Sequence, residues 1–185
     1  RILLRIAISG HTPTMEFLPR ARRLNLVIEP GSRVSALYHE APEASALLVL
    51  AHGAGAGMAH PFMASVAGFL AERGVSTLRF QFPYMEAGSK RPDRPATAYA
   101  TIRAAVAKAA KLAPALPLFA GGKSFGGRMT SQAEALEPLP GVRGLVFLGF
   151  PLHPAGKPSI DRAAHLADVH LPQLFIQGTR DALSE

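Results

Sequence analysis

A serine flanked by glycines stands at the end of an apolar run that gives way to a helical pattern. This segment, residues 118–127, has the sequence LFAGGKSFGG, and Ser124 is the centre of its Gly-x-Ser-x-Gly motif. Glycines at these positions remove side chains that would collide in a sharp turn between a strand and a helix. Such a turn leaves the serine hydroxyl exposed above the sheet, where it can attack a carbonyl carbon. We therefore predict that Ser124 is a nucleophile.

The motif has two alternative explanations. A phosphate-binding loop also uses Gly-Lys-Ser, but it requires a glycine five positions before Gly122, and Pro117 stands there. The residues between them resemble a strand and leave no room for a glycine-rich loop. A chance match is the second alternative, because the chain contains 17 glycines. Further motifs in the expected order are needed to exclude it.

The turn after an earlier apolar run supplies candidates for an oxyanion hole. This run, residues 46–57, has the sequence ALLVLAHGAGAG and ends in small residues. In the alpha/beta-hydrolase layout, one oxyanion amide belongs to the residue after the nucleophile and another to the turn after the third strand. Those positions are Phe125 and Ala54. Small residues suit the turn because an oxyanion must approach the backbone amides closely.

The neighbours of Ala54 are expected to shape the same pocket. We predict that Gly53 and Gly55 line it, and that His52 lines it while positioning the turn. A dinucleotide-binding turn also follows a strand and opens a helix. Its G-x-G-x-x-G spacing fails here because Met58 occupies the third glycine position.

The candidate for the catalytic acid follows the last apolar run. Residues 171–178, LPQLFIQG, are followed by Thr179, Arg180 and Asp181. Asp181 is predicted to hold a histidine in the tautomer that accepts the serine proton. An aspartate after a strand also occurs for turn chemistry alone. The assignment therefore depends on the chain order Ser, Asp, His.

The expected histidine is missing from its place, because none follows Asp181 before the last residue, Glu185. A serine hydroxyl without a base is a poor nucleophile, so we expect a truncated sequence that retains only residual activity by itself. His153 follows another apolar run and is expected to line the pocket with Lys123 rather than to replace the base. The other histidines are expected at the surface or at helix ends, or carry no signal: His11, His39, His60, His165 and His170.

Several motifs, taken in order, resemble a known family. They are LAHGAGAGMAHPFM, LRFQFPYMEAGSKRPDRP, GGKSFGGRM, LVFLGFPLHPAGKP and QGTRDAL. Together they resemble the alpha/beta-hydrolase-like domain of the nonspecific lethal (NSL) complex subunit 3 family and its bacterial relatives, which is similar to the dienelactone hydrolases. The resemblance spans about residues 32 to 185. It implies Ser124 as nucleophile and Asp181 as acid, with the family's histidine in a segment that this chain lacks.

The composition and the periodicity of the chain favour the same architecture. A length of 185 residues with 48% apolar content suits one domain with a sizeable core. Apolar runs alternate with helical patterns, which predicts an α/β fold: an alpha/beta-hydrolase fold with a mostly parallel sheet, helices on both faces, and the last strand and helix missing. The runs lie near Val34, Ala46, Thr77, Leu118, Leu145 and Leu174. Two helical stripes are expected to face the core: Phe62, Val66, Phe69 and Leu70, and then Tyr99, Ile102 and Val106.

The two ends of this domain are expected to differ in kind. Residues 32–185 are predicted to form the hydrolase domain, incomplete at its C-terminal end. Residues 1–31 are predicted to hold an N-terminal leader and a first strand region. Residues 1–14 of this part are a candidate for a spurious leader, because the first methionine is Met15. Their apolar stretch is broken by Arg5 and is too short to span a bilayer.

Charge and cysteine content limit the partners that we expect. The chain contains no cysteine, which excludes disulfides and thiolate metal sites. The net charge is +7, but the basic residues lack interleaved aromatics, so no nucleic acid partner is expected. Lys90, Arg91 and Arg94 stand in a loop expected to rim the pocket, and we hypothesise that they favour an anionic substrate. We expect no metal, no cofactor and no membrane partner.

We predict a cytoplasmic serine hydrolase that acts on a small carboxylic ester, thioester or lactone through an acyl-enzyme on Ser124. The alternative is a non-catalytic scaffold that binds a partner or a ligand. The strained serine turn argues against a scaffold, since binding alone has no need of it. The absence of the triad histidine argues for one. The oligomeric state and the identity of the substrate stay open.

Overall fold

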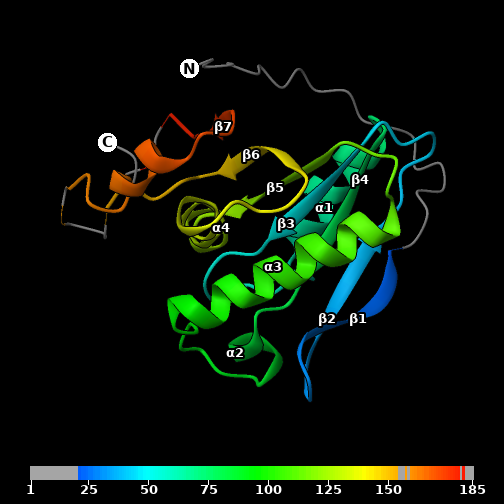
Figure 1. Cartoon of the computed structure of the whole chain (residues 1–185), viewed down its shortest axis with the longest axis horizontal. Coiled ribbons are helices and arrows are strands. Elements are labelled where there is room, and N and C mark those ends of the chain that lie inside the picture. Colours follow the sequence, from blue (N-terminus) through cyan, green and yellow to red (C-terminus); the bar gives the residue numbers. More distant parts are fainter. Residues whose placement is uncertain (1–20, 154–156, 158, 180, 182–185) are drawn as a thin grey trace.

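A computed structural model describes residues 21–153, 157, 159–179 and 181 of the chain. In this part of the chain, one seven-stranded sheet runs in the order β1-β2-β4-β3-β5-β6-β7 (Figure 1). Its strands are β1 (Arg22–Glu29), β2 (Ser32–His39), β3 (Ala46–Ala51), β4 (Val75–Phe80), β5 (Leu118–Lys123), β6 (Val142–Leu148) and β7 (Gln173–Ile176). Every apolar run that the sequence predicted as a strand is a strand in the structure.

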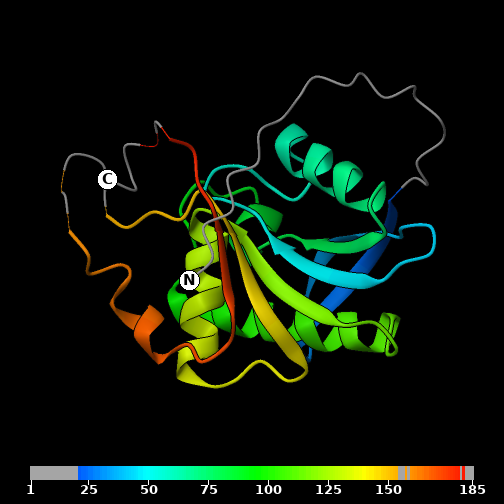
Figure 2. The same cartoon turned by 90° about the horizontal axis from the view of Figure 1, so that it is seen from above.

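Helices cover both faces of the sheet, as predicted (Figure 2). They are α1 (Pro61–Ala71), α2 (Pro83–Glu86), α3 (Pro95–Leu112), α4 (Phe125–Leu136) and the short 3-10 helix η1 (Ala164–Asp168). Helix α1 lies on one face, whereas α3 and α4 lie on the other. Three of the α-helices begin at a proline, whose fixed φ and missing N–H suit the first helical position: α1, α2 and α3.

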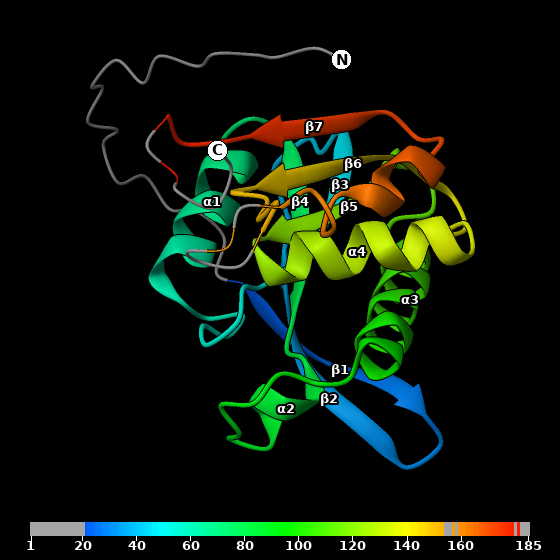
Figure 3. The same ribbon diagram turned by 90° about the vertical axis from the view of Figure 1, so that its left-hand side faces the viewer.

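The direction of the strands decides where a site can form. Strands β1 and β2 form an antiparallel hairpin, and β2 pairs antiparallel with β4. From β4 to β7, all neighbouring strands are parallel (Figure 3). The turns that follow β3, β5, β6 and β7 therefore meet at one edge of the sheet. Strand β1 precedes residue 32, so the sheet begins before that position.

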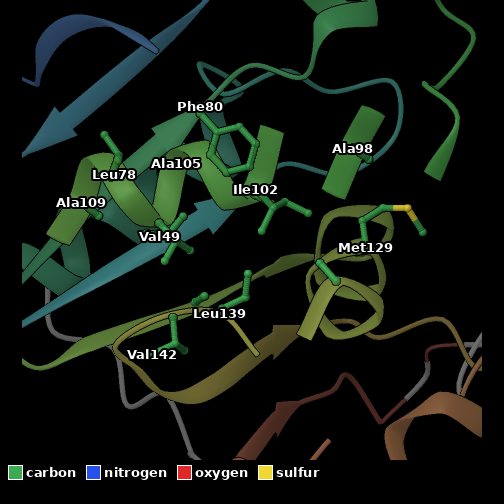
Figure 4. Packing of buried hydrophobic residues seen from close by; sticks show 14 of the residues in the cluster. Val49, Leu78, Phe80, Ala98, Ile102, Ala105, Ala109, Met129, Leu139 and Val142 are labelled. Carbon is green, nitrogen blue, oxygen red and sulfur yellow. The ribbon is translucent and has the colours of Figure 1, made fainter. Parts of the chain in front are cut away.

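The larger core lies between the sheet and helices α3 and α4. Figure 4 shows the helix residues Ala98, Ile102, Ala105, Ala109 and Met129 against the strand residues Val49, Leu78, Phe80 and Val142. The predicted stripe on α3 is confirmed, because Ile102 and Val106 are buried and Tyr99 packs against the same cluster. Alanines between these residues let α3 lie close to the strands.

The predicted core stripe on α1 is wrong for two of its members. Phe62 and Phe69 are 39% and 55% exposed. The buried face of α1 instead carries Met63, Ala67 and Ala71, which recur every four residues. Alanine has a smaller side chain than phenylalanine, so a face that carries Ala67 and Ala71 lets the helix pack closer to the sheet. The rings of Phe62 and Phe69 remain outside this buried face.

Candidate active site

Ser124 lies in a strained turn between β5 and α4. Its φ of 47° and ψ of −112° are unusual for a residue with a side chain. The backbone on both sides holds it there: the Ser124 N–H donates to the carbonyl of Leu148 at 3.1 Å, and the Ser124 carbonyl accepts from the N–H of Arg128 at 3.0 Å. Strain of this kind costs about 1–3 kcal/mol and persists only where the surroundings enforce it.

Glycines allow β3 and β5 to approach each other at this turn. A Cβ added to Gly126 would lie 2.5 Å from the carbonyl oxygen of His52, and one added to Gly122 would overlap the carbonyl of Ala51. Gly53 is close enough that its Cβ would lie 3.9 Å from the Cβ of Ser124. The absence of side chains thus brings the turn after β3 directly beside the serine.

Two backbone amides are available next to Ser124. Within the part of the chain that the structure describes, neither the Ala54 N–H nor the Phe125 N–H donates a hydrogen bond to a backbone or side-chain acceptor. Phe125 is the first residue of α4, so its amide has no acceptor within the helix. Ala54 and Phe125 line one cavity together with Ser124. Amides with free hydrogens at such a position can stabilise a developing oxyanion.

His52 lies beneath the turn and is fully buried. Its Nε2 accepts a hydrogen bond of 3.1 Å from the N–H of Phe82, and its Nδ1 lies 2.8 Å from the carbonyl of Gly53. These partners assign the proton to Nδ1 and leave the ring neutral. Burial lowers the pKa of His52, and the Gly53 carbonyl opposes that shift. With both nitrogens engaged, His52 positions the turn and is not a base for Ser124.

Two residues at the end of β4 hold the remainder of the loop after β3. The Met58 N–H donates to Oε1 of Gln81 at 2.9 Å, and Nη1 of Arg79 donates to the Met58 carbonyl at 3.0 Å. A Cβ on Gly57 would lie 2.8 Å from the same Gln81 oxygen. Neither positioning residue is predicted from the sequence, because a strand pattern does not tell which loop a strand-end side chain contacts.

The cavity at Ser124 has a volume of about 410 Å³, within the range of small-molecule sites. Its lining comes from several segments: Ala54, Pro92, Asp93, Pro95, Ser124, Phe125, Arg128, Met129, Pro151 and Arg162. A larger groove of about 620 Å³ lies between β1 and α3, but no serine, histidine or acid is among its lining residues. The chemistry therefore points to the smaller cavity.

Asp181 lies near the ends of β6 and β7. Its Oδ2 accepts a hydrogen bond of 2.8 Å from Nε2 of Gln177, and its N–H donates to the carbonyl of Gly178 at 3.2 Å. A Cβ on Gly149 would lie 3.5 Å from Oδ2 of Asp181 and 3.8 Å from Nζ of Lys123. Lys123 and Asp181 therefore both flank the turn after β6, next to the turn that carries Ser124.

The other residues expected to line the pocket are not among the residues that line this cavity. A Cβ added to Gly53 would lie 3.5 Å from the carbonyl oxygen of Lys123, and Nζ of Lys123 lies 4.7 Å from the centre of the Phe62 ring. Gly55 has a φ of 76°, a value that favours glycine. His153 is only 3% exposed, and its carbonyl accepts from Arg162 at 3.3 Å.

His165 lies in the last turn of the short helix η1, in agreement with the helix-end position expected of it. It is half-buried, and its Nε2 lies 2.8 Å from Oγ of Ser131 on α4. Burial, and next the charge of Arg128, lower the pKa of His165. Spacing alone gave no signal of this contact, because the two residues are 34 positions apart.

The loop expected to rim the pocket does contribute to the cavity, through Pro92, Asp93 and Pro95. Lys90, Arg91 and Arg94 are exposed and are not among the residues that line the cavity. The loop instead directs Asp93 inward, where its carboxylate accepts the N–H of Tyr84 at 3.1 Å. The cations that line the cavity are arginines from other segments.

A family model described as alpha/beta hydrolase domain matches residues 44–185. The chain belongs to this family. The fold class predicted from the sequence, an alpha/beta-hydrolase fold with a mostly parallel sheet, is thereby confirmed. No curated protein matches this alpha/beta hydrolase significantly in sequence.

Solved structures share the fold of this alpha/beta hydrolase. An alpha-beta serine hydrolase homologue from Coxiella burnetii has a TM-score of 0.71 at 17% identity, over 91% of this chain and 79% of the other. A dienelactone hydrolase from Anabaena variabilis has a TM-score of 0.68 at 17% identity, over 91% of both chains. A serine hydrolase without lid from Xanthomonas campestris has a TM-score of 0.65 at 21% identity, over 88% of this chain and 72% of the other. At these identities the likeness shows the fold.

The described residues contain no cluster of histidine and acidic side chains that could hold a metal ion. None of their helices is long and apolar enough to cross a membrane.

Proposed function

We propose that this alpha/beta hydrolase is a serine hydrolase that cleaves a small carboxylic ester, thioester or lactone through an acyl-enzyme on Ser124. The observation that carries the proposal is the conformation of Ser124. Its positive φ places a serine, rather than a glycine, at the strained turn that opens on a cavity shared with the Ala54 and Phe125 amides. Binding alone gives no reason to maintain that strain.

The first half of the proposed reaction forms the acyl-enzyme. Oγ of Ser124 attacks the carbonyl carbon while a base takes the hydroxyl proton. The carbonyl oxygen becomes an oxyanion that accepts hydrogen bonds from the amides of Ala54 and Phe125. The intermediate then collapses, the bond to the leaving group breaks, and the leaving group takes the proton from the base. A lactone would keep its leaving group tethered to the acyl chain.

The second half returns the enzyme to its starting state. A water molecule gives a proton to the base and attacks the acyl carbon. The bond to Oγ of Ser124 then breaks, the base returns the proton to Oγ, and the carboxylic acid product leaves. The proposed base is a histidine, as the chain order Ser, Asp, His of this fold leads us to expect. Asp181 would orient that histidine and stabilise its charged form. The Gln177 hydrogen bond supports this role because it holds the carboxylate in place.

A fluorophosphonate probe tests the nucleophile directly, because it reacts covalently with an activated serine. The protein expressed to its natural stop codon should be labelled, and Ser124→Ala should not. Ser131→Ala is the matched control, since Ser131 lies on the same helix and bonds His165 instead. A folded protein that resists the probe and hydrolyses no ester of a small-acyl panel would favour the non-catalytic scaffold.

We also infer a place within the family. The ordered motifs favour the branch that resembles NSL complex subunit 3 and its bacterial relatives, and they favour a cytoplasmic protein that acts without a cofactor. An alignment with members of that branch tests the placement, and a match of the quoted motifs in the same order is the expected result.

A further inference from the structure

Two arginines line the cavity that contains Ser124. Arg128 lies in the first turn of α4, and Arg162 lies in the segment before η1. The backbone N–H of Arg128 donates to the Ser124 carbonyl, which ties this arginine to the candidate nucleophile. Two positive groups from different segments therefore share the wall of the site.

Neither guanidinium is neutralised within the described residues. The ion pairs found there join Arg73 to Glu72 and Arg103 to Glu137, and they involve neither cavity arginine. The Nε of Arg128 is buried and has no hydrogen-bond partner in this part of the chain. Burial, and next the charge of Arg162, lower the pKa of Arg128. Like charges partly removed from water are costly unless an anion joins them.

The other titratable groups around the pair leave an excess of positive charge. Among the described residues that line the cavity, Asp93 is the one acid, and burial raises its pKa. Tyr99 and His165 lie near Arg128, and the pKa of Tyr99 is raised by burial. Burial lowers the pKa of His165, which disfavours its charged form. Two guanidiniums thus stand against one carboxylate.

We propose that Arg128 and Arg162 form a subsite for an anionic group of the substrate, a carboxylate or a phosphate next to the scissile carbonyl. A guanidinium presents N–H donors in a planar fork that matches the oxygens of either group. An anion bound there would offset the burial of the Arg128 guanidinium, whose Nε has no hydrogen-bond partner in the described part of the chain. Because it assigns a substrate, this inference rests on the proposed function. It assigns the preference for an anion to the two arginines of the cavity instead of the basic residues of the exposed loop.

The Ser124→Ala variant lacks the proposed nucleophile, so the binding of an anion to it can be measured without turnover. Calorimetric titration with succinate and with inorganic phosphate identifies the anion, and neutral succinamide is the matched probe. We expect one anion to bind, and Arg128→Gln or Arg162→Gln to weaken its affinity about tenfold or more. Arg143→Gln is the control, since Arg143 is exposed on β6. Equal affinity for anion and succinamide, or affinity that survives both substitutions, overturns the subsite.

Turnover provides the second measurement. Matched p-nitrophenyl esters of butyrate, of succinate as its free-acid monoester, and of a phosphorylated acyl chain are compared by kcat/KM. The ester that carries the preferred anion should have the highest kcat/KM. The ratio of its kcat/KM to that of the butyrate ester should fall about tenfold in either glutamine variant. Arg128→Lys should restore part of the advantage, and circular dichroism verifies that each variant folds.

The two proposals fail in distinguishable ways. Anion binding that depends on both arginines, with no ester hydrolysed, supports the subsite and contradicts the hydrolase. Hydrolysis of all esters at equal kcat/KM supports the hydrolase and contradicts the subsite. Tighter binding of phosphate than of succinate indicates that the anionic group of the substrate is a phosphate, and the reverse order indicates a carboxylate.

Discussion

His52 and Phe82 are joined by a buried hydrogen bond of 3.1 Å, in which the imidazole Nε2 accepts the backbone N–H. The residues are 30 positions apart and follow β3 and β4, respectively. Because Nδ1 of the same ring bonds the Gly53 carbonyl, one side chain links the oxyanion turn to the neighbouring strand end. The ring also packs edge-on against Phe82, with centroids 4.9 Å apart.

Replacement of His52 by alanine should damage both stability and turnover. The Phe82 N–H would be left buried without its acceptor, which costs about 1–3 kcal/mol of unfolding free energy. The turn that carries Ala54 would lose its anchor, so kcat should fall more than KM rises. Urea unfolding and steady-state kinetics measure the two effects. His170→Ala, an exposed histidine, is the control, and a His52→Ala protein as stable as this control would contradict the role.

Acidification should destabilise the fold through its buried histidines. Burial is the largest cause that lowers the pKa of His39, His52 and His165 below 6.5. Below that value the unfolded chain binds more protons than the native one, so unfolding free energy falls as pH decreases from 6.5 toward the native pKa values. Urea titrations at several pH values between 7.5 and 5 measure this slope. His165→Gln should reduce it, and an unfolding free energy independent of pH would contradict the prediction.

The strain at Ser124 should be visible in stability. Ser124→Ala and Ser124→Gly both remove the nucleophile, but only glycine adopts a φ of 47° with little cost. Relief of strain outweighs the larger unfolded-state entropy of glycine, so Ser124→Gly should be more stable than Ser124→Ala by about 1 kcal/mol. Thermal unfolding compares them. A glycine variant less stable than the alanine variant would mean that the turn stores no strain.

Arg103 should stabilise the helix that begins next to the nucleophile. From α3, its Nη2 donates to the carbonyls of Ala133 and Glu137 at 2.7 and 2.8 Å, at the end of α4. Arg103→Met should lower the unfolding free energy by about 1 kcal/mol after allowance for solvent screening. Arg73→Met is the matched control, because Arg73 is exposed and bonds only within its own helix end. Equal stability of the two variants would contradict this role.

Periodicity and glycine placement were sufficient for most of the architecture. Strand runs such as residues 46–51 and 118–123 carry their signal locally, in apolar side chains bounded by turns. The helical stripe of Ile102 and Val106 was equally local. The strand-to-helix turn at Ser124 followed from its glycines, and the positions after β3 and β5 reach one cavity because parallel strands end at the same edge. The roles assigned to these residues stay predictions.

The tertiary structure decided which polar side chains surround that turn. Arg128 and Arg162 share a cavity, and Gln81 holds the loop after β3, through contacts between segments distant along the chain. It also decided that α1 buries its alanines and exposes Phe69. Local sequence determines which segments are apolar and where the chain turns, because both depend on the side chains and backbone preferences of residues that are neighbours in the sequence. Which charges meet in one cavity depends on packing across the sheet, and no local pattern encodes it.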